Sequence, residues 1–497
     1  MGARPGGRAR VSDDAPLRGG WRPRLPIVLR LPLKTPPGLA VAAALLVLAE
    51  RGVLSSAFGL ARPASLALGL TLAAAALWVT EAVPLFVTSL LVLALELAWL
   101  GPELTQPGTG LFVNAFFSDV TLLFLGGFVL SAALTRTGLD RRLAQRLLGA
   151  TRDARGDARP ARVLVAVAAT TALLSMWMSN TAACALMLGL AQTMLARVPP
   201  GDGLRRSLVL TIAFAANLGG LATPIGSPPN AIMLRYLDQL PGGLAPSFSE
   251  WMALALPITL GLLVLLVLLL NRRYPSDASS VELPAGEARP FRAPQWLALV
   301  TLLVTIAGWL ASGDLGLTPG TVALVPVVVF FGTNLLRTED LRALPWDVLL
   351  LIGGGLALGT AIDVSGLAEE ASRALPLDGL APLALIAAAV AAAFGASAAM
   401  SNTAAANLLA PLLVGLSTTA QTTGPLFVAS AMACSLAMPL PVSTPPNAMA
   451  FSVELPPGPT RALDVRDLLT SGTVVGVVGV AVLLALSVSW FPAVLGR

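Results

Sequence analysis

The sequence predicts an all-α membrane protein that crosses the bilayer about eleven times and carries two re-entrant hairpins within two inverted repeats. Of its 497 residues, 56% are hydrophobic and only 12% are charged, a balance outside the usual range for soluble domains. Several apolar runs reach about 20 residues, the length that spans a bilayer core. A polar tripeptide interrupts two of the apolar stretches, and the same order of stretches surrounds each copy.

Composition also excludes several classes of function. The chain has no histidine, which excludes His-based catalysis, His metal ligation and His proton relays. The two cysteines, Cys184 and Cys434, lie among small apolar residues and are interpreted as packing residues. The Lys and Arg residues gather in a few loops, which indicates membrane topology and not nucleic-acid binding.

The N-terminal part is expected to form a tail and a scaffold. Residues 1–36 are rich in Arg, Gly and Pro and lack an apolar core before a small-residue cleavage site, so we expect a disordered basic cytoplasmic tail and not a signal peptide. Residues 37–150 are expected to supply four scaffold spans, at 38–60, 64–79, 83–100 and 119–138.

Three smaller features of this scaffold carry their own predictions. Trp78 and Glu81, between the second and third spans, are interpreted as interfacial anchors at a helix end. The stretch 112–117 is expected to lie along the membrane surface. The stretch 139–148 is expected to form an amphipathic segment, followed by a run rich in arginine.

The unit 163–271 contains the first polar tripeptide. Ser179-Asn180-Thr181 interrupts the apolar stretch 163–196 at its middle. The two halves, of about 16 residues each, are too short for two spans, so a re-entrant hairpin with the tripeptide at its tip is predicted. A helix over 208–237, broken at 223–230, and a full span over 251–270 follow. Irregular backbone at membrane depth is tolerated where it is buried in protein or lines a cavity.

The second half repeats this order. The run that starts at Asp119 (DVTLLFLGG) aligns with the run that starts at Asp347 (DVLLLIGGG). After a cytoplasmic loop at 272–294, the scaffold segment 295–366 contains spans at 295–312, at 319–336 and from Asp347 onward. The segment 378–493 then contains a hairpin at 378–418 around Ser401-Asn402-Thr403, a broken helix at 425–452 and a last span at 468–493.

Positive charge predicts the orientation. If the N-terminus is cytoplasmic, 27 of the 32 Lys and Arg residues fall in cytoplasmic segments, as the positive-inside rule requires. The C-terminus then lies on the outer side of the membrane. The protein is expected to be a multi-pass protein of the cell (inner) membrane. The span from Asp119 then runs inward and the span from Asp347 outward, so the two repeats are inverted.

The polar residues at the interruptions are suited to a cation. Hydroxyls, amide oxygens and freed backbone carbonyls are hard neutral ligands, as sodium prefers. Ser175 lies four residues before Ser179, and Ser397 four before Ser401, so each pair shares one helical face. Gly226 and Ser443 lie in the breaks that face the hairpins, where a free carbonyl could complete each site.

These residues together resemble a known family. The two Ser-Asn-Thr motifs, the Pro-Pro-Asn sequences that end at Asn230 and Asn447, and the stretch from Trp78 to Pro84 resemble the divalent anion/sodium symporter family over residues 38–493. The resemblance implies eleven spans plus two hairpins, a homodimer, and a transport domain that moves like an elevator against a scaffold.

The resemblance also implies roles for individual residues. One sodium site would use Ser175, Ser179, Asn180 and the Gly226 carbonyl, and a second would use Ser397, Ser401, Asn402 and the Ser443 carbonyl. The substrate carboxylates would contact Asn180, Thr181, Asn402 and Thr403, with Ser227 and Thr444 near them.

We therefore expect a secondary transporter and not an enzyme: a symporter that couples sodium to a small divalent anion, with a C4-dicarboxylate such as succinate, malate or fumarate as substrate. Sodium is the coupling ion, and no organic cofactor is expected. Other functions on the same fold remain open, namely exchange of two dicarboxylates or transport of sulfate, citrate or arsenite. An anion channel is a further alternative, which saturable counterflow would exclude.

Overall fold

The computed structural model describes residues 36–104, 109–152, 157–240, 243–283, 290–374, 381–417, 420–455 and 460–496. The predicted tail at 1–36 lies outside them except for its last residue. The described chain is helical, apart from two short antiparallel pairs of strands. β1 (Asp157–Ala158) pairs with β2 (Val281–Glu282), and β3 (Glu454–Leu455) pairs with β4 (Thr460–Arg461).

The first half contains the following helices: α1 (Pro36–Glu50), α2 (Val53–Phe58), α3 (Arg62–Thr80), α4 (Leu85–Leu95), the π-helical turn η2 (Glu96–Leu100), the 3₁₀ turn η3 (Gly101–Glu103), α5 (Thr109–Phe116), α6 (Asp119–Thr137), α7 (Leu139–Gly149), α8 (Pro160–Ser175), α9 (Asn180–Leu195), α10 (Gly203–Gly219), α11 (Pro228–Gln239) and α12 (Phe248–Arg273).

The second half contains α13 (Ala293–Leu310), α14 (Pro319–Gly332), α15 (Thr338–Arg342), α16 (Trp346–Val364), α17 (Leu367–Ala374), α18 (Pro382–Ala399), α19 (Asn402–Gly415), α20 (Ala420–Leu436), α21 (Pro445–Ser452), α22 (Val465–Ser487) and α23 (Trp490–Leu495).

Within the described residues, eight helical segments are long and apolar enough to cross a membrane. They include the predicted spans at 64–79, 83–100, 119–138, 251–270, 295–312 and 468–493, and the span from Asp347. The eighth is α18, an arm of the second predicted hairpin. The other three hairpin arms, α8, α9 and α19, are shorter apolar helices of 10–17 residues. The predicted span 319–336 is also shorter than expected, because its helix α14 has 14 residues, Pro319–Gly332.

Two expectations for the N-terminal scaffold were wrong, and a third stays a prediction. The predicted span 38–60 is two helices, because Gly52 adopts a left-handed conformation (φ 71°) between α1 and α2. The stretch 112–117 falls at α5, whose Phe112 and Phe116 side chains are buried where it packs against α16, while Val113 and Phe117 are exposed; its place along the membrane surface stays a prediction. Trp78 is not an interfacial anchor, since it is fully buried and its indole N–H donates to the Leu85 carbonyl.

Both predicted hairpins and both broken helices are present as helical elements. α8 and α9 form the first hairpin and pack against each other, and α18 and α19 form the second. In each, the motif serine caps the second arm: the hydroxyl of Ser179 accepts from Ala182 N at 3.2 Å, and that of Ser401 accepts from Ala404 N at 3.2 Å. Such a cap satisfies one of the free N–H groups at a helix start.

The breaks are closed by the asparagines of the two Pro-Pro-Asn sequences. Asn230 Nδ2 donates to the carbonyls of Gly220 (2.9 Å) and Thr223 (2.8 Å). Asn447 Nδ2 donates to the carbonyls of Met438 (2.9 Å) and Leu440 (3.2 Å). Because these carbonyls lie where the helix is unwound, the amides supply partners that the helix no longer provides.

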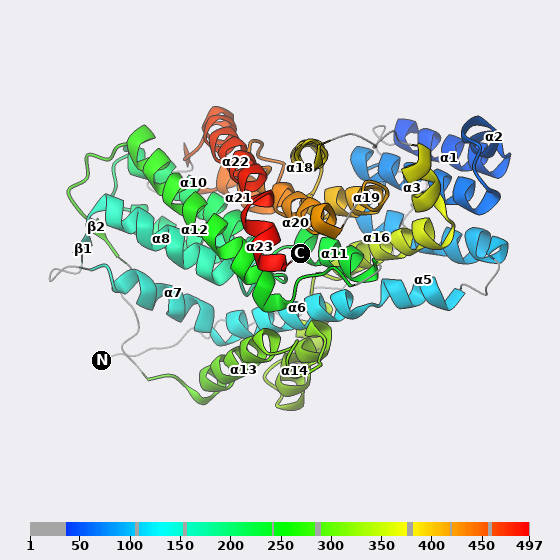
Figure 1. Cartoon of the computed structure of the whole chain (residues 1–497). Coiled ribbons are helices and arrows are strands. Elements are labelled where there is room, and N and C mark those ends of the chain that lie inside the picture. The colour runs from blue at the N-terminus through cyan, green and yellow to red at the C-terminus, as the bar shows by residue number, and fades with distance from the viewer. Residues whose placement is uncertain are drawn as a thin grey trace, which may run out of the picture.

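The helices pack as two groups, which Figure 1 allows the reader to follow. The hairpin bundle comprises α8–α12 and α18–α22; in it α10 packs on α8, α9, α12 and α21, and α20 packs on α18, α19 and α22. The flanking helices comprise α1–α6 and α13–α16; in them α6 packs on α14 and α16 packs on α4 and α5. The two groups meet where α16 contacts α11 and α19, where α6 contacts α11, where α13 contacts α12 and where α3 contacts α19.

Equivalent glycines of the two halves make equivalent close contacts among the flanking helices. Gly126 of α6 lies against Ala323 of α14, and a Cβ at Gly126 would be 2.7 Å from the Ala323 carbonyl carbon. Gly354, which aligns with Gly126, lies against Ser89 of α4, where a Cβ would be 2.6 Å from the Ser89 Cα. The close packing of each helix pair therefore depends on a glycine, which has no side chain, at the contact.

We expect Gly354→Ala to destabilise the protein by about 1–3 kcal/mol, because the added methyl group overpacks the contact with α4. Gly261→Ala is the matched control: Gly261 also lies in a helix, and a Cβ there meets nothing within 4 Å. The midpoint of thermal unfolding in detergent measures the difference. Equal midpoints for the two variants would contradict the packing argument.

Candidate functional site

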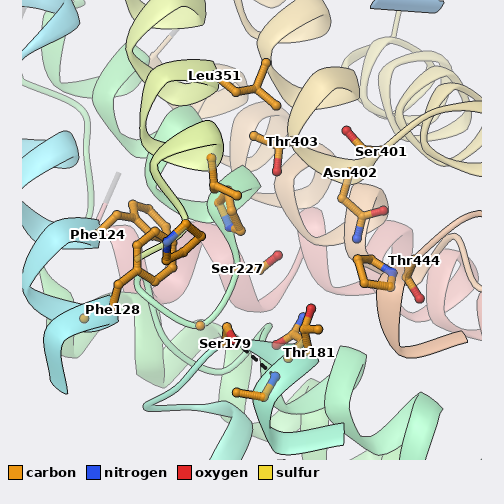
Figure 2. Close-up of a pocket in the computed structure, with 18 of the residues that line it drawn as sticks. Phe124, Phe128, Ser179, Thr181, Ser227, Leu351, Ser401, Asn402, Thr403 and Thr444 are labelled. Atoms are coloured by element: carbon orange, nitrogen blue, oxygen red, sulfur yellow. Dashed lines mark hydrogen bonds between the residues drawn. The ribbon is translucent and has the colours of Figure 1, made fainter. Parts of the chain in front are cut away.

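A cavity of about 660 Å³ lies between the two hairpin tips and the two helix breaks, within the range of about 300–1,000 Å³ typical of small-molecule sites. Figure 2 shows Ser179 and Thr181 on one side of it, Ser401, Asn402 and Thr403 on another, and Ser227 between them. The aromatic rings of Phe124 and Phe128 on α6 close a further side.

Nine of the twelve predicted site residues line this cavity: Ser179, Asn180, Thr181, Gly226, Ser227, Ser401, Asn402, Thr403 and Thr444. The other three, Ser175, Ser397 and Ser443, are buried and lie outside the cavity lining. Residues 222 positions apart in the chain, at the two motifs, are thus brought to one place. The prediction of their individual roles stays a prediction.

Oxygen atoms converge beside the first motif. Ser175 Oγ lies 2.6 Å from Asn180 Oδ1 and 2.7 Å from the Ala216 carbonyl oxygen. Exchanging the oxygen and nitrogen of the Asn180 amide would place the nitrogen 3.1 Å from the Gly226 carbonyl and 3.2 Å from that of Ala216. The amide therefore faces two carbonyls and a hydroxyl. Its oxygen suits a bound cation there, whereas its nitrogen suits the same place without one.

The second motif repeats this arrangement. Ser397 Oγ lies 2.7 Å from Asn402 Oδ1 and 2.6 Å from the Cys434 carbonyl oxygen, and its single proton serves one of these two acceptors at a time. In both halves the serine four residues before the motif serine bridges the motif asparagine and a carbonyl of the broken helix. Ser443 is buried in the second break, where its hydroxyl donates to the Leu440 carbonyl at 2.7 Å.

Gly220 is a site residue that the sequence did not reveal. A Cβ at this position would be 2.5 Å from Asn180 Oδ1 and 2.9 Å from the Gly226 carbonyl oxygen. Glycine is common in apolar helices, so this position carried no signal before the break was seen folded back on the hairpin. A glycine here keeps the oxygen cluster open.

Asn217 is a second site residue that the sequence did not reveal. It determines whether the Thr444 hydroxyl donates or accepts hydrogen bonds. Asn447 turns its nitrogen to the carbonyls of the break, so its oxygen accepts from Asn217 Nδ2 at 3.2 Å. The same Asn217 nitrogen donates to Thr444 Oγ1 at 3.1 Å, and Asn447 N donates to that oxygen at 3.2 Å. With two bonds accepted, the Thr444 hydroxyl has its own proton free to donate.

The first break has a similar but weaker partner from the other half. Ser227 Oγ lies 3.0 Å from Ser435 Oγ of α20, and either atom can donate. Each break is therefore held by a polar side chain from the broken helix of the other half, Asn217 for Thr444 and Ser435 for Ser227. For both Asn217 and Ser435 the sequence signal is a single polar residue in an apolar helix. This signal does not predict which residue it bonds.

The charge at the site is unusual. No Lys or Arg is found among the described residues that line the cavity, and Asp347 at the start of α16 is the acidic residue among them. Four helices begin at the cavity: α9 at Asn180, α19 at Asn402, α11 at Pro228 and α21 at Pro445. The positive ends of these four helix dipoles lie at the cavity, which favours anions. α11 and α21 each begin with two prolines, which have no N–H to donate, so these two helices contribute through their dipoles.

Comparison with known families and proteins adds a second line of observation. A family model named CitMHS and described as "Citrate transporter" matches residues 75–433. A sodium-dependent dicarboxylate transporter of Staphylococcus saprophyticus is 30% identical over 469 residues, which cover 86% of each chain. Its counterpart in Staphylococcus aureus strain USA300 is 29% identical over 470 residues, again 86% of each chain.

A transporter of Schizosaccharomyces pombe that is described as uncharacterized is 32% identical over 427 residues. This match covers 82% of the present chain, which spans about half of that longer protein (48%). Among solved structures, the YdaH transporter of Alcanivorax borkumensis is similar with a TM-score of 0.54 at 16% identity, over 82% of this chain and 97% of that one. MtrF of Neisseria gonorrhoeae has a TM-score of 0.50 at 13% identity, over 77% and 84% of the two chains. These two likenesses concern the fold alone.

We expect Gly220→Ala to weaken cation binding at the first motif at least tenfold, because the methyl group would push Asn180 away from the Gly226 carbonyl. Gly189→Ala on α9, where a Cβ meets nothing within 4 Å, is the control. Thermal stabilisation of the purified protein by sodium, titrated against potassium, measures the effect. A sodium titration of the Gly220 variant equal to that of the control would show that this cluster does not hold the ion.

Proposed function

Because this chain belongs to the citrate transporter family CitMHS, a family of multi-pass secondary transporters and not of enzymes, we propose that it is a sodium-coupled symporter of a small divalent anion. The proposed substrate is a C4-dicarboxylate such as succinate, malate or fumarate. Relatives that cover 86% of the chain are named sodium-dependent dicarboxylate transporters, which supports both the ion and the substrate class.

The single observation that carries this proposal is the pair of equivalent oxygen clusters at one cavity. Each combines a hydroxyl, a motif asparagine amide and a backbone carbonyl. With the amide oxygen turned towards a cation, these are neutral hard ligands of the kind that hold sodium. In this proposal one sodium binds at Ser175, Ser179, Asn180 and the Gly226 carbonyl. The second binds at Ser397, Ser401, Asn402 and the Ser443 carbonyl.

The anion would bind between the two sodium ions. Thr181 and Thr403 face the cavity from different hairpin tips (Figure 2), which suits two carboxylates at opposite ends of one molecule. Asn180 and Asn402 would contact the same carboxylates, with Ser227 and the donating hydroxyl of Thr444 beside them. Since no Lys or Arg of the described lining attracts the anion, the four helix N-termini and the bound cations supply the attraction.

For the membrane arrangement we propose eleven spans, two re-entrant hairpins and inverted repeats, with the N-terminus cytoplasmic and the C-terminus outside. Residues 163–271 and 378–493 would move as the transport domain against a scaffold formed by 37–150 and 295–366, in a homodimer. In this division the interface between the two domains would include the contacts of α16 with α11 and α19 and those of α7 with α8.

Citrate is the second candidate substrate, because the family description names it and the cavity of about 660 Å³ has room for a third carboxylate. A panel of succinate, malate, fumarate, citrate and sulfate, each tested for thermal stabilisation in sodium and in potassium, separates the candidates. Uptake into vesicles preloaded with substrate, with and without a sodium gradient, separates symport from exchange, because a pure exchanger needs no gradient.

We expect Asn180→Ala and Thr403→Ala to abolish sodium-dependent succinate uptake in proteoliposomes while leaving membrane insertion intact, since each removes a proposed contact to the anion. Thr193→Ala is the control, because Thr193 is an exposed α9 residue that bonds only its own helix, at Leu190, and does not line the cavity. Wild-type uptake by both site variants would refute the site assignment.

A second expectation concerns the donated proton of Thr444. A hydrogen bond to a charged group contributes about 1.5–3 kcal/mol, so Thr444→Val should weaken dicarboxylate binding roughly ten- to a hundredfold. Asn217→Leu should weaken it in the same direction, because it releases the Thr444 hydroxyl to rotate. Calorimetric affinities at saturating sodium measure both; an Asn217→Leu protein with wild-type affinity would mean that this asparagine does not orient Thr444.

A further inference from the structure

Two polar side chains of the hairpin bundle bond the backbone of α16, across the boundary with the flanking helices. Asn407 of α19 donates through Nδ2 to the Leu351 carbonyl at 2.8 Å. The Tyr236 hydroxyl of α11 donates to the Gly355 carbonyl at 3.0 Å. Both side chains are buried, and the two acceptors lie one helical turn apart. We refer to these two bonds as the α16 latch.

A glycine lets each donor approach its carbonyl. A Cβ at Gly355 would collide with the Asn407 amide, and a Cβ at Gly359 would collide with the Tyr236 ring. Each donor therefore lies over one glycine and bonds the carbonyl four residues earlier. If α19 and α11 leave α16, the amide and the hydroxyl lose these partners, which is costly in an apolar setting. The latch therefore favours the arrangement in which the bundle contacts α16.

The repeat places the counterparts of this contact at the cavity. Asn407 and Ala185 each lie four residues after a motif threonine, and Gly355 and Gly127 each end one of the two aligned runs of α16 and α6. Asn407 and Gly355 touch, whereas Ala185 and Gly127 both line the cavity. A Cβ at Gly127 would meet the Ile225 side chain and not α9. The surfaces that are closed in the second half are thus separated by the cavity in the first.

The first half has no counterpart of the latch. Ala185 stands where the second half has Asn407, and its methyl group cannot donate. Tyr236 lies six residues after Asn230, and the residue six after Asn447 is Val453, which has no donor either. Inverted repeats permit a transporter to exchange the contacts of its two halves when it passes from one side to the other. After such an exchange α9 would close on α6, and no bond would replace the latch.

We propose that Asn407 and Tyr236 are positioning residues that hold the hairpin bundle on α16 when the cavity contains no ligand. The inference rests on the proposed function, because it takes the bundle to move against the flanking helices. In the opposite conformation α9 closes on α6 and α19 leaves α16. Because the latch exists in one conformation only, the two are unequal in free energy, and the empty transporter rests in the one described here.

Two substitutions remove the bonds one at a time. Tyr236→Phe removes a hydroxyl and keeps the ring, and Asn407→Leu replaces the amide with an apolar side chain of the same branching. A buried hydrogen bond between membrane helices shifts an equilibrium about three- to tenfold. Each variant should therefore raise the population of the opposite conformation by about that factor.

Cysteine labelling measures this population. Ala404 is fully buried, and its counterpart Ala182 lines the cavity, so Ala404→Cys should react with a water-soluble maleimide only in the opposite conformation. Ala406→Cys is the matched probe, because Ala406 and its counterpart Cys184 are both fully buried. Each probe is placed in a Cys184→Ala, Cys434→Ala background and labelled in potassium buffer without sodium or dianion. At low maleimide concentration the labelling rate is proportional to the population of the reactive conformation.

Tyr236→Phe and Asn407→Leu should each speed the labelling of Ala404→Cys about three- to tenfold and leave Ala406→Cys protected. An unchanged or undetectable rate at Ala404→Cys in both variants would overturn the proposal. Equal acceleration at the two probes would also overturn it, because local loosening of α19 would then explain the labelling.

Tyr274→Phe is the matched control. Tyr274 is the other of the two tyrosines in the chain, and its hydroxyl donates to Asp467 of α22 at 2.8 Å, between two helices of the hairpin bundle. Since this bond does not cross to α16, its loss should leave the labelling of both probes unchanged. Acceleration at Ala404→Cys by Tyr274→Phe equal to that by Tyr236→Phe would contradict a specific role for the latch.

Uptake measurements separate this inference from the proposed function. The labelling needs no ligand, so faster labelling of the latch variants in a protein without sodium-dependent uptake of any dianion would refute the proposed function and leave the latch standing. Sodium-dependent dianion uptake by the wild type, together with unchanged labelling of both latch variants, would refute the latch and leave the proposed function standing.

Discussion

Unpaired backbone groups at membrane depth are the constraint on which this structure depends. Two long apolar helices are unwound at their centres, and in an apolar setting each freed carbonyl costs several kcal/mol unless it finds a partner. Asn230 and Asn447 supply these partners from within each break, and Asn217 and Ser435 brace each break from the other half. The remaining carbonyls and the helix N-termini then face one cavity, where an ion and a small anion could satisfy them.

The two halves carry the same scheme with different details. Ser175 and Ser397 make the same pair of contacts, and Gly126 and Gly354 make the same kind of close helix contact. The braces differ, because Asn217 leaves Thr444 as a donor, whereas the Ser227–Ser435 pair can be oriented either way. A substrate with two similar ends would therefore meet two dissimilar ends of the cavity.

Much of this was predictable from residue pattern. Hydropathy and the repeated motif located the hairpins, the breaks and nine cavity-lining residues. Each motif interrupts an apolar run, and this contrast places it within the depth of the membrane. Residues with no such contrast were missed. Gly220 and Asn217 look ordinary in sequence and acquire their roles from neighbours far along the chain. Trp78 was misplaced for the same reason, since the residues that cover it come together only through tertiary packing.

In the proposed function, bound cations attract the anion in a cavity whose described lining has no Lys or Arg, so sodium and dianion should bind cooperatively. Reciprocal titration of the purified protein tests this most directly: succinate affinity with and without saturating sodium, and sodium affinity with and without saturating succinate. Thermodynamic linkage requires the two ratios to be equal, and we expect both to exceed tenfold. Succinate that binds equally well in sodium and in potassium would contradict it.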